Sequence, residues 1–218
     1  MYYADHFYML NESNEWYEVT EIVVSDTVTK IGYRQFYGFD NITSVTIGNS
    51  VTSIGEYAFY GCSSLTSIII PDSVISIGSY AFRDCSSLTS VTIGDGVTSI
   101  GEYAFSGCSS LTSVTIGDGV TSIGEYAFSI CSSLTNVYYK GTIEDWCNIS
   151  FDDSGSNPMY YAEHFYMLNE SNEWYEVTEV VVPDTVTKIG KYQFAGFDNI
   201  TSITISDSVV AIGRDAFS

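Results

Sequence analysis

The hydrophobic positions of this chain follow one short pattern many times over. The pattern reads L-x-x-V-x-I, then a turn, then V-x-x-I-G-x-x-A-F-x-x-C, and one copy runs from Leu65 to Cys85. Ile68 and Ile70 are two residues apart, so the pattern predicts a short strand with both side chains on one face. Glycine and serine between the apolar positions predict turns. The sequence therefore predicts many short strands joined by turns.

The same pattern returns every 23 residues. Residues 90–112 are followed by residues 113–135 with one change, Ile130 in place of Gly107. Further copies occupy residues 21–43, 44–66, 67–89 and 179–201, and a truncated copy begins at residue 202. One such unit cannot bury its own apolar face, but stacked units bury it continuously. The repeat therefore predicts a β-rich solenoid with a parallel sheet, one strand per repeat, and rungs about 4.8 Å apart.

Three columns of equivalent residues describe the expected stack. A predicted stack of aromatic rings contains Phe36, Phe59, Phe82, Phe105, Phe128, Phe194 and Phe217. A position that predicts positive φ or a close backbone approach holds Gly32, Gly55, Gly78, Gly101, Gly124, Gly190 and Gly213. A third column holds Cys62, Cys85, Cys108 and Cys131, with phenylalanine at residues 39 and 197. Because phenylalanine replaces cysteine there, we expect buried free thiols rather than disulfides.

The 23-residue pattern is interrupted between Thr135 and Glu179, and we term residues 136–178 the linking unit. Its TIEDWCNI stretch fits a capping box and predicts a short helix, and Asn157-Pro158 predicts a second helix start. The segments FYML, NESNE and WYEVTEVVV predict a strand, a turn and a strand. Residues 1–20 match the second half of this unit, and residues 1–47 differ from residues 159–205 at seven positions.

These matches divide the chain into four parts. Residues 1–20 are the second half of a linking unit, and residues 21–135 are five repeats. The linking unit covers residues 136–178, and residues 179–218 hold one full and one truncated repeat, all in one continuous solenoid. Because Met1 corresponds to Met159, we expect both ends to be internal positions of a longer array. Exposed rungs at such ends could drive end-to-end association of two copies.

Composition narrows the classes of partner and activity. The formal charge is −20 with only seven Lys and Arg, so nucleic acid is not an expected partner. No apolar stretch approaches the ~20 residues of a membrane helix, so membrane insertion is not expected. The sequence contains no P-loop, G-x-S-x-G or H-E-x-x-H motif, so we expect neither an enzyme nor a cofactor. His6 and His164 follow carboxylates, but their sequence neighbourhood predicts surface or hinge positions.

One acidic column is a weak candidate for calcium binding. Asp72, Asp95 and Asp118 each follow a predicted strand and would stack from rung to rung. One carboxylate per rung supplies few of the six to eight oxygen ligands that calcium takes. Since aspartate also suits turns, a solvated turn residue is the favoured interpretation of this column.

Candidate ligand-binding residues lie on the predicted sheet face and in the linking unit. Thr46, Thr92, Thr115 and Tyr138 would face outward and could hydrogen-bond a protein or a glycan. Threonine also simply suits an exposed strand, which leaves the alternative of no binding. Trp146 belongs to an aromatic-rich segment that could be core or could form a carbohydrate-stacking platform.

These repeats resemble the BspA-like leucine-rich repeats, a 23-residue type found in bacterial surface proteins. The likeness covers essentially the whole chain and is carried by cassettes such as CSSLTSVTIGDGVTSIGEYAFSGC, residues 85–108. The resemblance implies a right-handed superhelix with one parallel strand per turn. It also implies an extracellular or cell-surface location and a role in adhesion or surface recognition.

Two functions remain open at this point. The first is a non-enzymatic segment of a larger secreted or surface protein that binds a host protein or a glycan. The second is a structural spacer that displays another domain and binds nothing itself. Near-identical neighbouring repeats favour the spacer, because a dedicated site needs side chains that differ between rungs. The aromatic residues of the linking unit favour binding.

Overall fold

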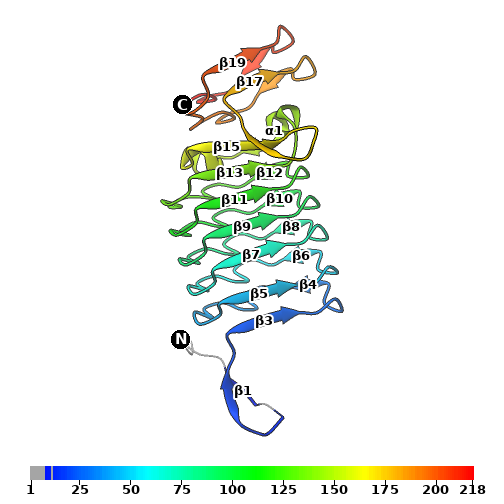
Figure 1. Cartoon of the computed structure of the whole chain (residues 1–218), viewed down its shortest axis with the longest axis vertical. Coiled ribbons are helices and arrows are strands. Elements are labelled where there is room, and N and C mark those ends of the chain that lie inside the picture. Colours follow the sequence, from blue (N-terminus) through cyan, green and yellow to red (C-terminus); the bar gives the residue numbers. More distant parts are fainter. Residues whose placement is uncertain (1–7, 11) are drawn as a thin grey trace.

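The computed structural model describes residues 8–10 and 12–218 and shows a rod-like solenoid (Figure 1). The rod has about eight turns that repeat at about 23-residue intervals. Strands of successive turns lie parallel along one side of the rod, and the chain runs steadily from one end to the other. The predicted leucine-rich-repeat solenoid is therefore confirmed.

The main sheet lies along one side of the central turns. Its parallel strands are β7 (Ser67–Ile70), β9 (Ser90–Ile93), β11 (Ser113–Ile116), β13 (Asn136–Tyr139) and β15 (His164–Leu168). The strand β16 (Trp174–Glu176) joins the edge at β15 in the antiparallel direction. Opposite residues in β9 and β11 are 23 apart, as in the pair Val91 and Val114.

A second parallel sheet is built from two-residue strands on a neighbouring side of the rod. It consists of β4 (Lys30–Ile31), β6 (Ser53–Ile54), β8 (Ser76–Ile77), β10 (Ser99–Ile100), β12 (Ser122–Ile123) and β14 (Ser150–Phe151). The last strand comes from the linking unit, so this unit continues the stack instead of leaving it.

Short sheets occupy the two ends of the rod. The pairs are β3 (Glu21–Val24) with β5 (Ser44–Ile47), β17 (Glu179–Val182) with β19 (Ser202–Ile205), and β18 (Lys188–Ile189) with β20 (Ala211–Ile212). The hairpin of β1 (Tyr8–Leu10) and β2 (Trp16–Glu18) projects beyond β3 at the N-terminal end (Figure 1).

The core is a set of stacked columns, as the repeat predicts. The rings of Phe59, Phe82 and Phe105 are fully buried and stack with centroids 5.1 and 5.3 Å apart. Beside them, the thiol of Cys85 donates to the carbonyl of Phe59 at 3.2 Å. All five cysteines are free and buried, which confirms the expected thiols. Burial raises the pKa of Cys62, Cys131 and Cys147 to about 12, which disfavours the thiolate, the reactive form of the side chain.

The glycine column marks close backbone contact between rungs. A Cβ atom at Gly101 would lie 2.4 Å from the backbone nitrogen of Ser79, and one at Gly78 would lie 2.6 Å from that of Glu56. The close approach is therefore confirmed. The glycines of this column do not adopt positive φ. The sequence left both explanations open, and the contact between rungs selects one of them.

Positive φ occurs instead at a tyrosine column two residues later. Tyr57, Tyr80, Tyr103 and Tyr126 have φ between 53° and 60°, a conformation that is uncommon for residues other than glycine. The conformation turns each N–H toward the next rung: Tyr80 donates to the carbonyl of Glu102 at 2.8 Å. The rings also stack, with centroids 4.7 to 5.1 Å apart. Contacts between rungs thus hold a backbone conformation that the local sequence disfavours.

The linking unit contains the short helices that the sequence predicts. Helix α1 (Ile143–Asn148) begins after Thr142, and the hydroxyl of Thr142 accepts the N–H of Asp145 at 3.2 Å in a capping box. The 3₁₀ helix η1 (Ser154–Ser156) precedes a second one, η2 (Pro158–Tyr160). Asn157 caps η2 by accepting the N–H of Met159 at 3.0 Å. Both predicted helix starts and the β15–β16 hairpin are confirmed. The segment WYEVTEVVV, predicted as one strand, forms two strands instead, because β16 pairs with β15 and β17 pairs with β19.

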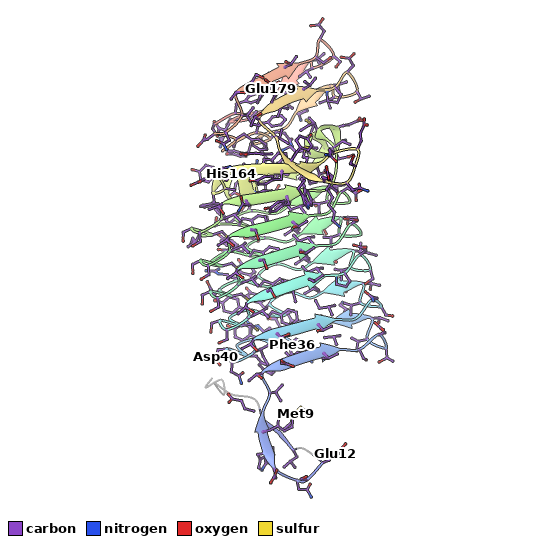
Figure 2. The ribbon with its side chains drawn as sticks, viewed as in Figure 1. Met9, Glu12, Phe36, Asp40, His164 and Glu179 are labelled. Carbon is purple, nitrogen blue, oxygen red and sulfur yellow. The ribbon has the colours of Figure 1, made fainter. Side chains whose placement is uncertain are left out.

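Trp146 is a core residue of the linking unit. Its side chain is fully buried, and it packs edge-on against Tyr139, Phe165 and Phe197 at 5.1, 4.8 and 5.7 Å. Its indole N–H donates to the carbonyl of Gln193 at 2.8 Å. Side chains fill the space between the levels of His164 in β15 and Glu179 in β17 (Figure 2). The interpretation of Trp146 as a ligand-stacking platform is therefore wrong, because the indole joins the two stacks of rungs.

Ile130 is the repeat position at which a substitution should stabilise the protein. It has φ 62° and is 63% exposed, whereas the equivalent Gly61 and Gly107 have φ 72° and 76°. The left-handed region costs a non-glycine residue about 1–2 kcal/mol, and more for a β-branched one. We expect Ile130→Gly to raise the free energy of unfolding by about 1 kcal/mol in urea denaturation. Ile75→Gly, at an exposed position without positive φ, should lower it, and a loss at both positions would contradict this account.

Trp146 should be essential for stability. Replacing a buried tryptophan by alanine leaves a cavity and costs about 3–5 kcal/mol. We expect Trp146→Ala to lower the urea midpoint strongly, and Trp16→Ala to change it little, because Trp16 is 70% exposed. Equal effects of the two substitutions would show that Trp146 does not join the stacks.

Candidate recognition surface at the linking unit

The outward face of the main sheet carries one row of side chains from rung to rung. Thr92 lies opposite Ile69 on one side and Thr115 on the other, and Thr115 lies opposite Tyr138. Thr46 points outward on β5 and shares a shallow hollow of about 370 Å³ with Ile69. The structure therefore places Thr92, Thr115 and Tyr138 in one outward row of the main sheet, and Thr46 outward on β5 of the neighbouring sheet. Their role in binding stays a prediction.

The row changes from hydroxyls to aromatic rings at the linking unit. Tyr138 lies opposite Tyr166 of β15, and their rings stack with centroids 4.8 Å apart at 17°. Trp174 of β16 meets the ring of Tyr138 edge-on at 5.1 Å and is 40% exposed. We term Tyr138, Tyr166 and Trp174 the joint patch. It is the place where this face differs most from the repeats.

The hairpin geometry explains why these three rings gather. The residues of β15 alternate between half-buried and buried, so His164, Tyr166 and Leu168 face outward together. In the antiparallel pairing, Trp174 lies opposite Leu168 and therefore shares that face. Tyr166 and Trp174 were not among the residues predicted from the sequence. The alternation within HFYML and the short turn before WYE were the signals for them.

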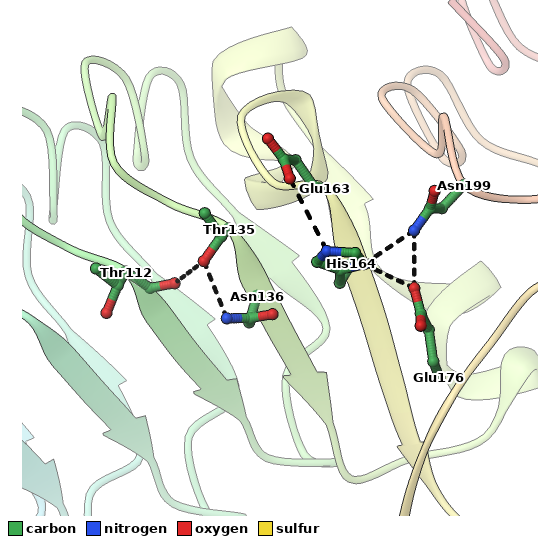
Figure 3. Close-up of polar contacts among 7 residues, drawn as sticks. All are labelled: Thr112, Thr135, Asn136, Glu163, His164, Glu176 and Asn199. Atoms are coloured by element: carbon green, nitrogen blue, oxygen red, sulfur yellow. Dashed lines mark hydrogen bonds and ion pairs between the residues drawn. The ribbon is translucent and has the colours of Figure 1, made fainter.

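A polar cluster borders the joint patch (Figure 3). His164 Nδ1 lies 2.7 Å from Glu176 Oε1, and the amide of Asn199 donates to the same carboxylate oxygen at 2.7 Å. These hydrogen bonds, first that of His164, lower the pKa of Glu176. Glu163 Oε2 lies 3.9 Å from the other ring nitrogen. The cluster connects the linking unit to the turn before β19, which fits the hinge or surface position expected for His164; His6 lies outside the described residues.

Next to this cluster, a hydroxyl ladder ends at the linking unit. The hydroxyl of Thr135 donates to the carbonyl of Thr112 at 3.1 Å, and the amide of Asn136 donates to Thr135 Oγ1 at 2.9 Å (Figure 3). The side chain of Thr112 bonds to Thr89 in the same way. These threonines satisfy backbone carbonyls of the neighbouring rung, so they support the face without belonging to the joint patch.

The acidic column is engaged in contacts between rungs. The carboxylate of Asp72 accepts the backbone N–H of Asp95 at 2.9 Å, and Asp95 forms an ion pair with Lys140 at 2.9 Å. Asp118 lies exposed in the next turn. Among the residues that the structure describes, no group of three or more His, Cys, Asp and Glu could hold a metal ion. The turn interpretation of Asp72 and Asp95 accounts for their contacts.

The N-terminal hairpin provides a second copy of part of this surface. Trp16 occupies the position in β2 that Trp174 occupies in β16, and Leu10 lies opposite Trp16 as Leu168 lies opposite Trp174. Trp16 is 70% exposed, compared with 40% for Trp174, since only Trp174 packs against Tyr138. The two hairpins therefore separate the contribution of a lone tryptophan from that of the assembled joint patch.

None of the described residues forms a helix that is both long and apolar enough to cross a membrane.

Several solved structures share this architecture. The leucine-rich repeat protein of T. pallidum is 23% identical, with a TM-score of 0.54, and the match covers 96% of this chain and 83% of that one. The pneumococcal vaccine antigen PcpA is 16% identical, with a TM-score of 0.50, over 97% of this chain and 51% of its own. A leucine-rich cell surface protein of Faecalibacterium prausnitzii A2-165 is 26% identical over the whole chain and 73% of its own, with a TM-score of 0.41. The first two likenesses show the fold alone.

The family comparison covers nearly the whole sequence. No curated protein sequence matches this chain. The family described as the BspA type leucine-rich repeat region matches in six copies, over residues 12–135, 52–172 and 169–218. With the matching cassettes and the solenoid of parallel rungs, this coverage shows that the chain belongs to the BspA-type leucine-rich repeat family.

Proposed function

We propose that this chain is a non-enzymatic recognition segment of a secreted or surface-anchored protein and that it binds a neutral glycan at the joint patch. The observation that carries the proposal is the cluster of Tyr138, Tyr166 and Trp174 next to rungs that present threonine at the equivalent position. Family membership supports a surface role. Aromatic rings offer apolar faces to sugar rings, and Tyr and Trp are the residues enriched at binding surfaces.

The size of the joint patch favours a glycan over a protein. A stable protein interface covers about 800 Å² on each partner and needs 20–30 residues a side. Three partly exposed aromatic side chains offer much less area, enough for one or two sugar rings. The polar groups of His164, Glu176 and Asn199 beside the rings could hydrogen-bond sugar hydroxyls. A host protein is therefore the less favoured ligand of this patch.

Charge favours a neutral glycan over an acidic one. The chain carries a formal charge of −20, and Glu163 near the joint patch has a side chain that is 75% exposed. Carboxylates around the patch would repel sulfated or sialylated sugars, and this repulsion weakens with salt. Binding of the proposed ligand should depend little on ionic strength.

The spacer function remains the second candidate because of the repeats themselves. Residues 90–112 and 113–135 differ only at one position, so neighbouring rungs present nearly the same surface. A rod of repeated rungs can hold another domain away from a surface without binding anything. Only the linking unit breaks this uniformity, so a test of binding has to address its aromatic residues.

Substitutions in the joint patch should weaken glycan binding selectively. We expect immobilised neutral glycans to retain the full chain, and Trp174→Ala to weaken binding about tenfold through the loss of ring contact. Trp16→Ala is the matched control, because it removes the same side chain from the hairpin that lacks Tyr138, and it should leave affinity unchanged.

Three outcomes of this experiment would count against the proposal. Absence of any retained neutral glycan at millimolar sugar concentration would favour the spacer. Equal losses for Trp16→Ala and Trp174→Ala would contradict the joint patch as the binding site. Stronger retention of acidic glycans would contradict the argument from charge.

A further inference from the structure

One column of the repeat distinguishes the rungs that follow a linking unit from all others. Most copies hold a buried alanine at this position: Ala58, Ala81, Ala104, Ala127 and Ala216. The exceptions are Gln35 and Gln193. Each belongs to the first repeat after a copy of MYYADHFYML or MYYAEHFYML. A polar side chain in a buried column needs a hydrogen-bond partner, so the question is what these glutamines bind.

The structure answers the question for Gln193. This side chain is fully buried, and its amide donates to the backbone carbonyl of Trp146, while the Trp146 indole donates to the backbone carbonyl of Gln193 at 2.8 Å. The amide of Asn157 donates to the carbonyl of Tyr192 at 2.8 Å. Thus segment 142–158 of the linking unit is held on the rung by reciprocal polar bonds at its centre.

Apolar packing surrounds these bonds. Val182, Val186, Ile189 and Phe194 are all at most 5% exposed beneath the linking unit. The equivalent residues at the N-terminal end of the rod are identical: Val24, Val28, Ile31 and Phe36. The N-terminal face of the rod therefore carries the same four apolar side chains as the face that the linking unit covers.

At the N-terminal end this face is partly uncovered: Val28 and Phe36 are half-buried, while Val24 and Ile31 are 7% and 2% exposed. Val24, Val28, Ile31, Gln35 and Phe36 line a hollow of about 460 Å³. Gln35 is exposed, in contrast to the fully buried Gln193. Figure 2 shows Phe36 in the first turns of the rod, close to the end from which the β1–β2 hairpin projects.

The charges of this N-terminal face and of segment 142–158 are opposite. The face carries Lys30 in the lining of the hollow and the exposed Arg34 beside it, in a chain that has only seven Lys and Arg. Segment 142–158 is acidic, with two carboxylates in the first turn of α1 and Asp152 and Asp153 further on. Opposite charges on the two surfaces would favour their association.

We infer that the N-terminal face is a docking surface for a second copy of segment 142–158, with Gln35 forming the bonds that Gln193 forms with Trp146. The occupant is a separate polypeptide with the chemistry of segment 142–158: a tryptophan that exchanges hydrogen bonds with the glutamine, and an acidic surface. Two differences at the rim should make this contact weaker than the internal one. Tyr33 replaces Lys191, which donates to the carbonyl of Asp152 at 2.5 Å, and Tyr37 replaces the buried Ala195.

The inference can be tested by adding the proposed occupant to the full chain. A copy of residues 136–158 is fused directly ahead of Met1, as it precedes Met159 in the chain, and amide hydrogen exchange of residues 21–47 is measured. We expect at least tenfold slower exchange there than in the unextended chain, because docking covers this face. The matched control is the same extension with its tryptophan replaced by alanine, which should give no protection.

A second substitution separates docking from a general effect of the added residues. Gln35→Ala should remove most of the gain in the extended chain and change little in the unextended chain, where Gln35 is exposed. A free peptide of residues 136–158 added to the unextended chain should protect the same residues, because the proposed occupant is a separate molecule. Protection by the fusion alone would contradict docking of a separate molecule. Protection by neither, or protection that is unchanged by Gln35→Ala, would overturn the inference.

Discussion

The structure depends on contact between equivalent residues of successive rungs. Each turn gives and receives backbone hydrogen bonds, as when Thr112 donates to Thr89 at 2.9 Å and Phe105 donates to Ala127 at 2.8 Å. The same step stacks the Phe and Tyr rings and brings the glycine backbone within reach of the previous turn. A single 23-residue unit has none of these contacts, so its fold exists only in the array.

This dependence explains why the linking unit has a composition of its own. It must close one run of rungs, where β16 ends the main sheet in antiparallel pairing, and must then support the next run through Trp146 and Gln193. Large aromatic residues fill the irregular space between the runs, and some of them reach the surface as the joint patch. The uniform rungs therefore form the rod, and the linking unit provides the one surface patch that differs from the surface of the repeats.

Much of this arrangement could be predicted from the sequence because the period is strict. Residues 23 apart stack on one another in such an array. This predicted the stacked Phe rings, the buried thiols and the outward positions of Thr92 and Thr115. The capping box at Thr142 and the proline at residue 158 are local signals, and both were sufficient to place helices.

The remaining features arise from contacts between distant residues. The positive φ of Tyr80 is held by a bond to the next rung, and tyrosine has no local preference for that conformation. Trp146 and Trp174 look alike in sequence, yet one is fully buried and the other 40% exposed, because an irregular segment has no period from which a face can be assigned. The register of Tyr138 with Tyr166, 28 residues apart, likewise follows from the length of the linking unit and not from the repeat.

The central claim is that stability resides in contacts between rungs, and residue-resolved amide hydrogen exchange of the full chain tests it most directly. The account predicts the strongest protection in strands β7 to β13, which have a rung on each side, and a stepwise decrease toward β3 and β19 at the two ends. Equal protection in all rungs, or stronger protection at an end than in the centre, would contradict it.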